Sequence, residues 1–113
     1  MIRSDKRWTV HDRDGNAIYL TEERWAQIID EANHVEMIGY EELIKTTIRQ
    51  GKRRQEPLNP RKCRYYRYFA QLPDGVNHIV AIILFGFDVD GQGHAQPNNF
   101  VTTAFFKHIQ VKE

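Results

Sequence analysis

The stretch HIVAIILFGF, residues 78–87, contains the longest apolar run of the chain and decides its fold class. Apolar residues occupy both alternating sets of positions, so a strand made from this stretch would be covered on both faces of a sheet. The run is also far too short to span a bilayer. The stretch therefore predicts a central strand in a layered domain.

Other strands are expected on both sides of this stretch in the sequence. They comprise residues 9–11, 17–20, 62–71 and 100–108. The first two would form a hairpin around Asp14-Gly15, because both positions of an Asp-Gly pair tolerate positive φ. A turn at 73–75 and a polar connection at 88–99 would separate the later strands.

Two helices are expected between the hairpin and the later strands. A stripe with helical spacing comprises Trp25, Ile28, Ile29 and Ala32. Thr21 is a suitable N-cap for this first helix, which would end near Asn33-His34. The second helix is indicated by the apolar positions of residues 40–48 and is stopped by Gly51.

These elements predict an α+β fold in which two helices pack on a mostly antiparallel sheet, in the order β-β-α-α-β-β-β. A chain of 113 residues fits a single domain, 1–113. Hydrophobic residues at 41% and charged residues at 27% are typical of a soluble globular protein. The N-terminus leads into no apolar signal segment, and the single Cys63 allows no internal disulfide. We therefore expect a cytoplasmic protein without a membrane segment.

Several kinds of catalytic site are disfavoured by the motifs that the sequence lacks. The five histidines are dispersed, without metal-ligand spacing. Residues 88–99 begin like a calcium loop but end at Asn99, where a bidentate acid is needed. No Gly-x-Ser-x-Gly, phosphate-cradling loop or dinucleotide fingerprint is present. We expect neither a metal nor a cofactor.

Positive charge is concentrated in residues 52–68, which hold seven Lys and Arg against one acid, Glu56, in a chain of net charge +1. Strand alternation would place Arg64, Tyr66 and Tyr68 on one face of the sheet. The other face would carry the alternate residues, Cys63, Tyr65, Arg67 and Phe69. Guanidinium groups can hold phosphates and tyrosine rings can stack on unpaired bases, which indicates contact with nucleic acid. The same residues would equally suit a strand edge that resists aggregation.

Residues 51–62 ahead of that strand would form a basic approach that Pro57 and Pro60 hold extended, suited to steering a phosphate backbone. His34 at a helix end could act as a base, or be a solvated histidine favoured by the helix dipole. His78 could share the face of Arg64 or simply sit near a turn, and we favour the turn. Of Thr102 and Thr103, one could face the helices and the other a cleft.

Five short motifs, taken in order, resemble the nuclease family that groups barnase, EndoU, the colicin tRNases and the RelE toxins. The motifs are Arg24-Trp25-Ala26-Gln27-Ile28, His34-Val35-Glu36, Tyr65-Tyr66, residues 79–87 and Thr103-Ala104-Phe105. The resemblance covers about residues 16–108. It implies two helices on a curved antiparallel sheet, with metal-independent RNA cleavage in the concave face. Many members of that family are toxins paired with an antitoxin or immunity protein.

The chain departs from the family pattern at two positions. Gln27 stands where the pattern has histidine, and Val35 stands where it has proline. Because Gln27 cannot act as an acid or base near neutral pH, this substitution indicates a changed or weakened active centre. If His34 is the important histidine, the loss matters less.

We predict a metal-independent endoribonuclease, the toxin of a toxin–antitoxin pair, in which a ribose 2′-hydroxyl attacks the adjacent phosphate. The predicted catalytic residues are His34, Arg64, Tyr66 and Thr103. The predicted RNA-binding residues are Arg24, Lys52, Arg53, Arg54, Lys62 and Arg67. Its partners would be RNA and an antitoxin or immunity protein.

Each predicted catalytic residue has a role. His34 would be the general base or acid, and Tyr66 would stack on a base or transfer a proton. Arg64 would hold the phosphate backbone, and Thr103 would donate a hydrogen bond at the scissile phosphate. Two alternatives stay open: a non-catalytic RNA-binding module, and a protein-interaction domain that docks an acidic partner through its basic face.

Overall fold

Strand β5, His78–Leu84, lies at the centre of the fold, and all side chains of residues 79–83 are buried. Its neighbours are β4 (Asn59–Tyr68) and β8 (Asn99–Lys107), which both pair with it antiparallel. The structure is a computed structural model that describes residues 5–110. Residues 1–4 and 111–113 of the predicted domain lie outside the described residues. Coverage of β5 on both faces, as the apolar stretch predicted, is confirmed.

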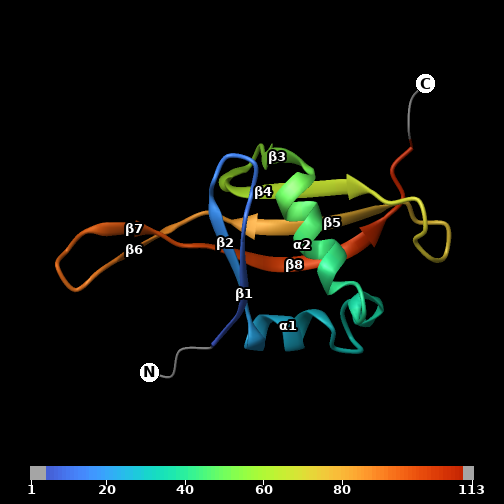
Figure 1. The fold of residues 1–113 in the computed structure, drawn as a ribbon, viewed down its shortest axis with the longest axis horizontal. Coiled ribbons are helices and arrows are strands. Elements are labelled where there is room, and N and C mark those ends of the chain that lie inside the picture. Colours follow the sequence, from blue (N-terminus) through green and yellow to red (C-terminus); the bar gives the residue numbers. More distant parts are fainter. Residues whose placement is uncertain (1–4, 111–113) are drawn as a thin grey trace.

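Residues 5–110 form a six-stranded sheet in the order β1-β2-β8-β5-β4-β3 (Figure 1). The remaining strands are β1 (Lys6–His11), β2 (Ala17–Thr21) and β3 (Lys52–Glu56). Every neighbouring pair is antiparallel except β2 and β8, which run parallel over a short stretch. The predicted α+β class, with two helices on a mostly antiparallel sheet, is confirmed.

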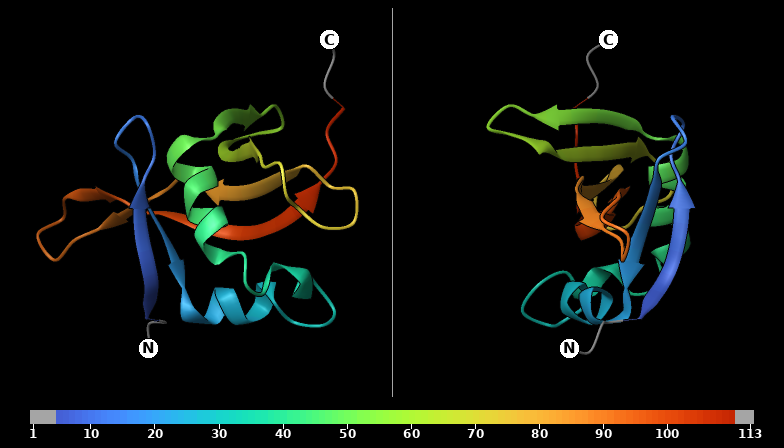
Figure 2. Two further views of the ribbon diagram at one scale, coloured as in Figure 1. Left: turned by 45° about the vertical axis from the view of Figure 1, so that its right-hand side comes forward. Right: turned by 90° about the vertical axis from the view of Figure 1, so that its left-hand side faces the viewer.

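The two helices are α1 (Glu22–Ile28) and α2 (Glu41–Gln50), joined through a short 3₁₀ turn, η1 (Val35–Met37). Helix α2 lies across one face of β4 and β5, whereas α1 runs beside β8 (Figures 1 and 2). Together they bury the core between helices and sheet, which includes Ile28, Ile44 and Ile48. No helix in the described part of the chain is long and apolar enough to cross a bilayer.

Helix α1 begins as predicted but ends earlier. The Thr21 hydroxyl accepts a hydrogen bond of 3.1 Å from the Arg24 backbone N–H, which confirms the N-cap. The helix ends at Ile28 rather than near Asn33-His34, and Ala32 is consequently exposed. Side chains compete with helical hydrogen bonds here: Asp30 accepts from the Ala32 N–H, and Asn33 donates to the Gln27 carbonyl, each at 2.9 Å.

The predicted extended approach over residues 51–62 is wrong, because these residues form a hairpin. Strand β3 pairs along β4, with Lys52 opposite Tyr66 and Arg54 opposite Arg64. Pro57 lies in the tight turn between the two strands, and β4 begins at Asn59 instead of Lys62. The lack of apolar residues hid β3, since it is an edge strand whose side chains are mostly exposed on both faces.

Gly51 connects α2 directly to β3 and stops the helix as predicted. Its N–H donates to the Thr47 carbonyl at 2.8 Å. A Cβ atom at this position would lie 2.3 Å from the Thr47 oxygen and 2.7 Å from the Tyr66 oxygen. Only glycine therefore lets the helix end pack this closely on β4.

Residues 88–99 form most of a two-stranded arm that projects from the sheet (Figure 1, left). Its strands are β6 (Phe87–Val89) and β7 (Ala95–Pro97). Asp90 closes the turn by accepting hydrogen bonds of 2.9 Å from the Gln92 and His94 N–H groups. The predicted polar connection is therefore a hairpin, with Phe87 74% exposed.

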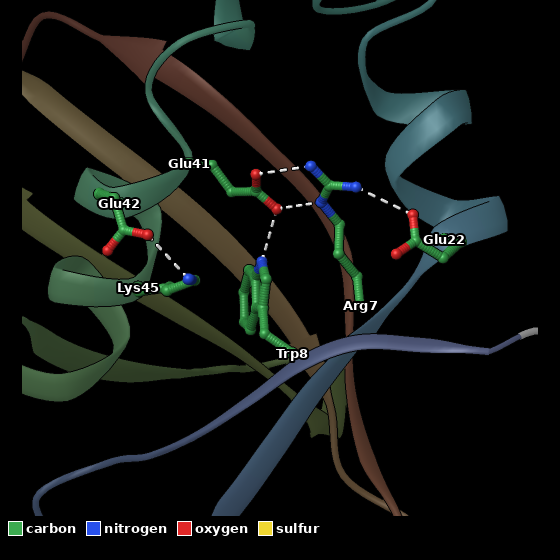
Figure 3. Close-up of polar contacts among 6 residues, drawn as sticks. All are labelled: Arg7, Trp8, Glu22, Glu41, Glu42 and Lys45. Carbon is green, nitrogen blue, oxygen red and sulfur yellow. Dashed lines mark hydrogen bonds and ion pairs between the residues drawn. The ribbon is translucent and has the colours of Figure 1, made fainter.

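A polar cluster ties β1 to both helices (Figure 3). The Arg7 guanidinium hydrogen-bonds to the Glu41 carboxylate of α2 and, at 2.9 Å, to the Glu22 carboxylate of α1. The Trp8 indole N–H donates to Glu41 at 2.7 Å. These bonds hold the first strand against α2, on the side of the sheet that contains the core.

Candidate functional site

The face of the sheet opposite α2, here called the open face, carries the strand residues that alternate away from the core. These residues are Lys52, Arg54, Lys62, Arg64, Tyr66, Tyr68, His78, Val80, Ile82, Thr103, Phe105 and Lys107. Buried residues such as Tyr65, Ala81 and Ala104 occupy the alternate positions on β4, β5 and β8. Hairpin β3–β4 and the segment after α1 lie on opposite sides of this face (Figure 2, right).

Two rows of side chains cross the open face because the strands are in register. One row runs Arg54, Arg64, Ile82, Thr103, and the next runs Lys52, Tyr66, Val80, Phe105. At the centre of the rows, Val80 is 0% and Ile82 is 5% exposed. The flanking polar and aromatic side chains therefore cover the apolar centre and form the surface that a ligand would meet.

Arg54 and Arg64 face each other on adjacent strands, which places two guanidinium groups on one patch. Glu56 is the acid nearest to Arg64, at 3.4 Å from its Nε. That Nε atom is buried and donates no hydrogen bond within residues 5–110. A pocket of about 370 Å³ opens here, lined by Arg54, Arg64, Tyr66, Lys107, His108, Ile109 and Gln110. Like charges directly opposite each other destabilise a sheet, so this arrangement suits an anion between them.

Most strand cations of the open face have no acidic partner. Lys52, Arg54, Lys62 and Lys107 form no ion pair in the described part of the chain. Cations on the helix side are paired instead, for example Arg7 with Glu41 and Lys45 with Glu42. The open face is thus the side that would attract a polyanion.

His78 lies on the open face, beside two tyrosines. Its ring centroid is 6.3 Å from that of Tyr66 and 5.9 Å from that of Tyr68, and the residue is 8% exposed. Burial, and then the nearby His108 and Lys52, lower the pKa of His78. Our interpretation of His78 as a histidine merely near a turn is wrong. Its register opposite Tyr68 could have revealed this, had the strand boundaries been known.

His34 reaches the open face from the other side, at the start of η1. Its ring centroid lies 5.6 Å from that of Phe105, and its Nδ1 lies 3.2 Å from the Glu36 carboxylate. Thr103 is on the same side of β8 as Phe105. Strand β8 is two strands from β4, or about 10 Å. The four predicted catalytic residues therefore share a face but form two groups, with Arg64 and Tyr66 apart from His34 and Thr103.

A second pocket of about 240 Å³ lies where α1 passes β2 and β8. It is lined by Tyr19, Thr21, Glu23, Arg24, Gln27, Phe100 and Val101. The ring centroids of Tyr19 and Phe100 are 6.1 Å apart. Arg24 and Gln27 lie off the buried side of α1, so they extend the open face toward its far end.

Two of the predicted RNA-binding residues lie on the helix side instead. Arg53 alternates with Arg54, stacks 4.5 Å over the Phe85 ring, and lies 3.8 Å from Asp12 and 3.6 Å from Asp14. Arg67 stacks 4.8 Å over Phe69. Strand alternation predicted this side for Arg67, and the pairing of Arg53 with Tyr65 places Arg53 there as well. Neither residue therefore shares the face of Lys52, Arg54 and Arg64.

Thr102 and Thr103 occupy different positions on β8. Thr102 occupies a bulge of β8 and its hydroxyl donates to the Ile82 carbonyl at 3.1 Å, whereas Thr103 lies on the open face.

Within residues 5–110, no three His, Cys, Asp or Glu side chains converge to hold a metal ion. No family model, no curated protein and no solved structure matches the chain. The chemistry of the open face is therefore argued from its own residues.

Proposed function

We propose that the chain is a metal-independent endoribonuclease that binds single-stranded RNA across its open face. The observation that carries the proposal is the pair of guanidinium groups, Arg54 and Arg64, that face each other with one nearby acid, Glu56. Repulsion between the two guanidinium groups lowers the folding stability of the free protein. A phosphate bound between them would accept hydrogen bonds from both and neutralise their charge. A destabilising pair of this kind is expected at a site where binding phosphate matters more than folding stability.

The aromatic residues of the open face support single-stranded nucleic acid as the ligand. Tyr66, Tyr68 and Phe105 are only partly buried or exposed, and they lie on two adjacent rows next to the cations. Unpaired bases can stack on such rings while the phosphates meet guanidinium and ammonium groups. Paired bases, by contrast, are stacked inside the duplex, so they could not stack on these rings.

The side chains present also support cleavage of RNA. The ribose 2′-hydroxyl attacks the neighbouring phosphorus, the bond to the 5′-oxygen breaks, and a 2′,3′-cyclic phosphate and a 5′-hydroxyl remain. This step needs a base, an acid and positive charge at the phosphate. Arg54 and Arg64 supply the charge, while imidazole and phenol groups on the same face can move the two protons. DNA lacks the nucleophile and would be bound without being cut.

The test is incubation of the purified protein with an oligoribonucleotide in EDTA, followed by analysis of the fragment ends. We expect 2′,3′-cyclic phosphate termini, and we expect Arg64→Ala to slow cleavage about 100-fold or more, since it removes charge stabilisation at the phosphate. Arg49→Ala is the matched control, because Arg49 is an exposed arginine of α2 on the opposite side of the sheet. Cleavage should be unchanged in that variant.

Other outcomes point to different functions. Salt-sensitive RNA binding without cleavage would overturn the nuclease and identify an RNA-binding module. Absence of both binding and cleavage, with an acidic protein that co-purifies, would identify a protein-interaction domain. Cleavage that EDTA abolishes would contradict the metal-independent mechanism.

We also propose that the nuclease is the toxin of a toxin–antitoxin pair. An acidic segment of an antitoxin or immunity protein could cover the unpaired cations Lys52, Arg54 and Lys107 and thereby block RNA. Induced expression in a bacterial host should then arrest growth, and Arg64→Ala should relieve the arrest while Arg49→Ala should not. Normal growth with the active enzyme would contradict the toxin role.

A further inference from the structure

We propose that His78 is the general base of this nuclease, held by Asn77 in the tautomer whose Nε2 accepts the proton of the ribose 2′-hydroxyl. The inference rests on the proposed function, and it changes which histidine does the chemistry. His34, the sequence-based candidate, lies at the other end of the open face beside Phe105.

The orientation of the Asn77 amide is fixed by two reciprocal hydrogen bonds to the backbone of Ile109. Its Nδ2 donates to the Ile109 carbonyl, and its Oδ1 accepts from the Ile109 N–H, each at 2.9 Å. If the amide oxygen and nitrogen were exchanged, the NH₂ group of Asn77 would face the Ile109 N–H and its oxygen would face the Ile109 carbonyl, so both hydrogen bonds would be lost. The oxygen of Asn77 is therefore the atom that faces His78.

This oxygen determines the tautomer of His78. The Nδ1 of His78 lies 2.7 Å from Asn77 Oδ1, which can only accept a hydrogen bond. Nδ1 must then carry the proton, and in the neutral ring Nε2 carries the lone pair. Nε2 has no hydrogen-bond partner within residues 5–110 and is not among their buried unsatisfied atoms. A basic nitrogen is thus left available to a ligand.

The surroundings of His78 are those of a base beside a phosphate. It lines a pocket of about 480 Å³ together with Arg13, Gln50, Gly51, Lys52, Tyr66, Arg67 and Tyr68. Lys107 is its register partner on β8, and His108 follows it. No carboxylate lines this pocket within the described chain. Burial, and then His108 and Lys52, lower the pKa of His78, so its ring is neutral near pH 7 and able to accept a proton.

The proton transfers balance with one further group, Tyr66. Nε2 of His78 takes the 2′-hydroxyl proton as the 2′-oxygen bonds to phosphorus. The bond from phosphorus to the 5′-oxygen breaks, and the departing oxygen takes the phenolic proton of Tyr66, whose ring lies 6.3 Å from the imidazole. His78 then returns its proton to the Tyr66 phenolate through water, which restores the free enzyme. Arg54 and Arg64, in the row beside Tyr66, face the charge on the phosphate.

Nuclear magnetic resonance of the imidazole nitrogens tests the tautomer and the site without any turnover. In the neutral range we expect a protonated Nδ1 and an unprotonated Nε2 for His78. Asn77→Ala should release the ring to a mixture of tautomers, and Asn77→Asp, which keeps an acceptor for Nδ1, should restore the original one. Uridine 3′-monophosphate should raise the pKa of His78 and leave the imidazole signals of His94, on the projecting arm, unchanged. An Nε2-protonated ring, or a His78 that ignores the nucleotide, overturns the proposal.

Cleavage kinetics test the role itself. His78→Gln should slow cleavage by about 10² to 10⁴-fold. The decrease of kcat at acidic pH should also disappear in this variant, because that decrease reflects protonation of the His78 imidazole. Asn77→Ala should lower kcat more than it changes KM, and Asn77→Asp should recover part of the loss. If His78→Gln folds, as judged by its unfolding midpoint, and retains the acidic limb, His78 is not the base.

The two proposals fail in different ways. RNA that the native enzyme leaves intact overturns the nuclease and with it the role of His78. RNA that is cut equally by native enzyme and His78→Gln overturns only the assignment of the base. In that case loss of cleavage in His34→Gln would return the role to the histidine beside Phe105.

Discussion

The adjacent residues Tyr65 and Tyr66 occupy opposite faces of the same strand and have opposite surroundings. Tyr65 is 1% exposed, and its hydroxyl donates to the Asp12 carboxylate at 2.5 Å. Burial and this hydrogen bond raise the pKa of Tyr65. Tyr66 instead lies between Lys52 and Val80 on the open face, beside His78. One tyrosine therefore completes the core, and the other is available to a ligand.

The same division separates the two arginines of β3. Arg53 lies near Asp12 and Asp14 and stacks on Phe85, whereas Arg54 faces Arg64 and forms no ion pair within residues 5–110. The basic and aromatic stretch thus consists of two interleaved sets. One set stabilises the fold, and the other leaves its charge unneutralised at a cost in stability.

The largest expected difference between the two faces is in stability. Tyr65→Phe should lower the free energy of unfolding by about 2 kcal/mol, because the buried Asp12 carboxylate loses the hydrogen bond from the Tyr65 hydroxyl and keeps only those from Asp14 and Asn16. Tyr66→Phe should change it by less than about 0.5 kcal/mol, since no buried group loses a partner. Urea denaturation of both variants measures the difference, and equal losses would show that the two faces are not divided in this way.

Lowering the pH should destabilise the protein by a smaller amount, through two carboxylates on the helix side of the sheet. Burial alone would raise the pKa of Asp12, but hydrogen bonds from Tyr65 and Asn16 outweigh burial and lower it. Burial likewise opposes the hydrogen bonds from Arg7 and Trp8 that lower the pKa of Glu41.

Because both pKa values are lower in the folded state, the unfolded chain takes up protons first as the pH falls. The stability that these carboxylates contribute should be complete above about pH 5 and should disappear as the pH falls through their folded pKa values. Denaturation curves from pH 7 to pH 3 test this. Asp12→Asn should be less stable than the native chain at pH 7 and should lose less between pH 5 and pH 3. A parallel loss in both proteins would contradict the role of Asp12.

The sequence predicted those parts of the fold that depend on local apolar patterns. The run in residues 78–87 gave the central strand, and Thr21 and Gly51 correctly marked a helix start and a helix end. Local pattern also separated the two faces of β4, since alternation alone distinguishes Tyr65 from Tyr66. It failed for β3, because an edge strand that is polar on both faces has no apolar periodicity.

Candidate residues could be assigned to the open face only where the strand boundaries were already known. Arg53 could not be separated from Arg54 while residues 51–62 were expected to form an extended basic approach instead of a paired strand. His78 was set aside because its position opposite Tyr68 depends on pairing between distant segments. The reciprocal hydrogen bonds of Asn77 with Ile109 likewise join residues from two separate parts of the chain. Such contacts depend on register, which no single segment of the sequence contains.

The smallest expected effect compares Arg54 with Arg53 in RNA binding. A 2′-O-methyl oligoribonucleotide binds but cannot be cut, because its 2′-oxygen has no proton to lose. Arg54→Ala should reduce the slope of log K against log salt by about 0.7, which corresponds to about fivefold weaker binding at 0.1 M salt. Fluorescence anisotropy across a salt series measures this slope.

Arg53→Ala removes the same charge from the same strand and is therefore the matched control. It should leave the salt slope unchanged while lowering the free energy of unfolding by up to about 1 kcal/mol, because Arg53 neutralises acids of the folded chain and not phosphates. A net-charge effect would lower binding equally in both variants, whereas a surface confined to the open face affects only Arg54. Equal slopes for the two variants would therefore show that RNA responds to the overall charge of the hairpin and not to one face of it.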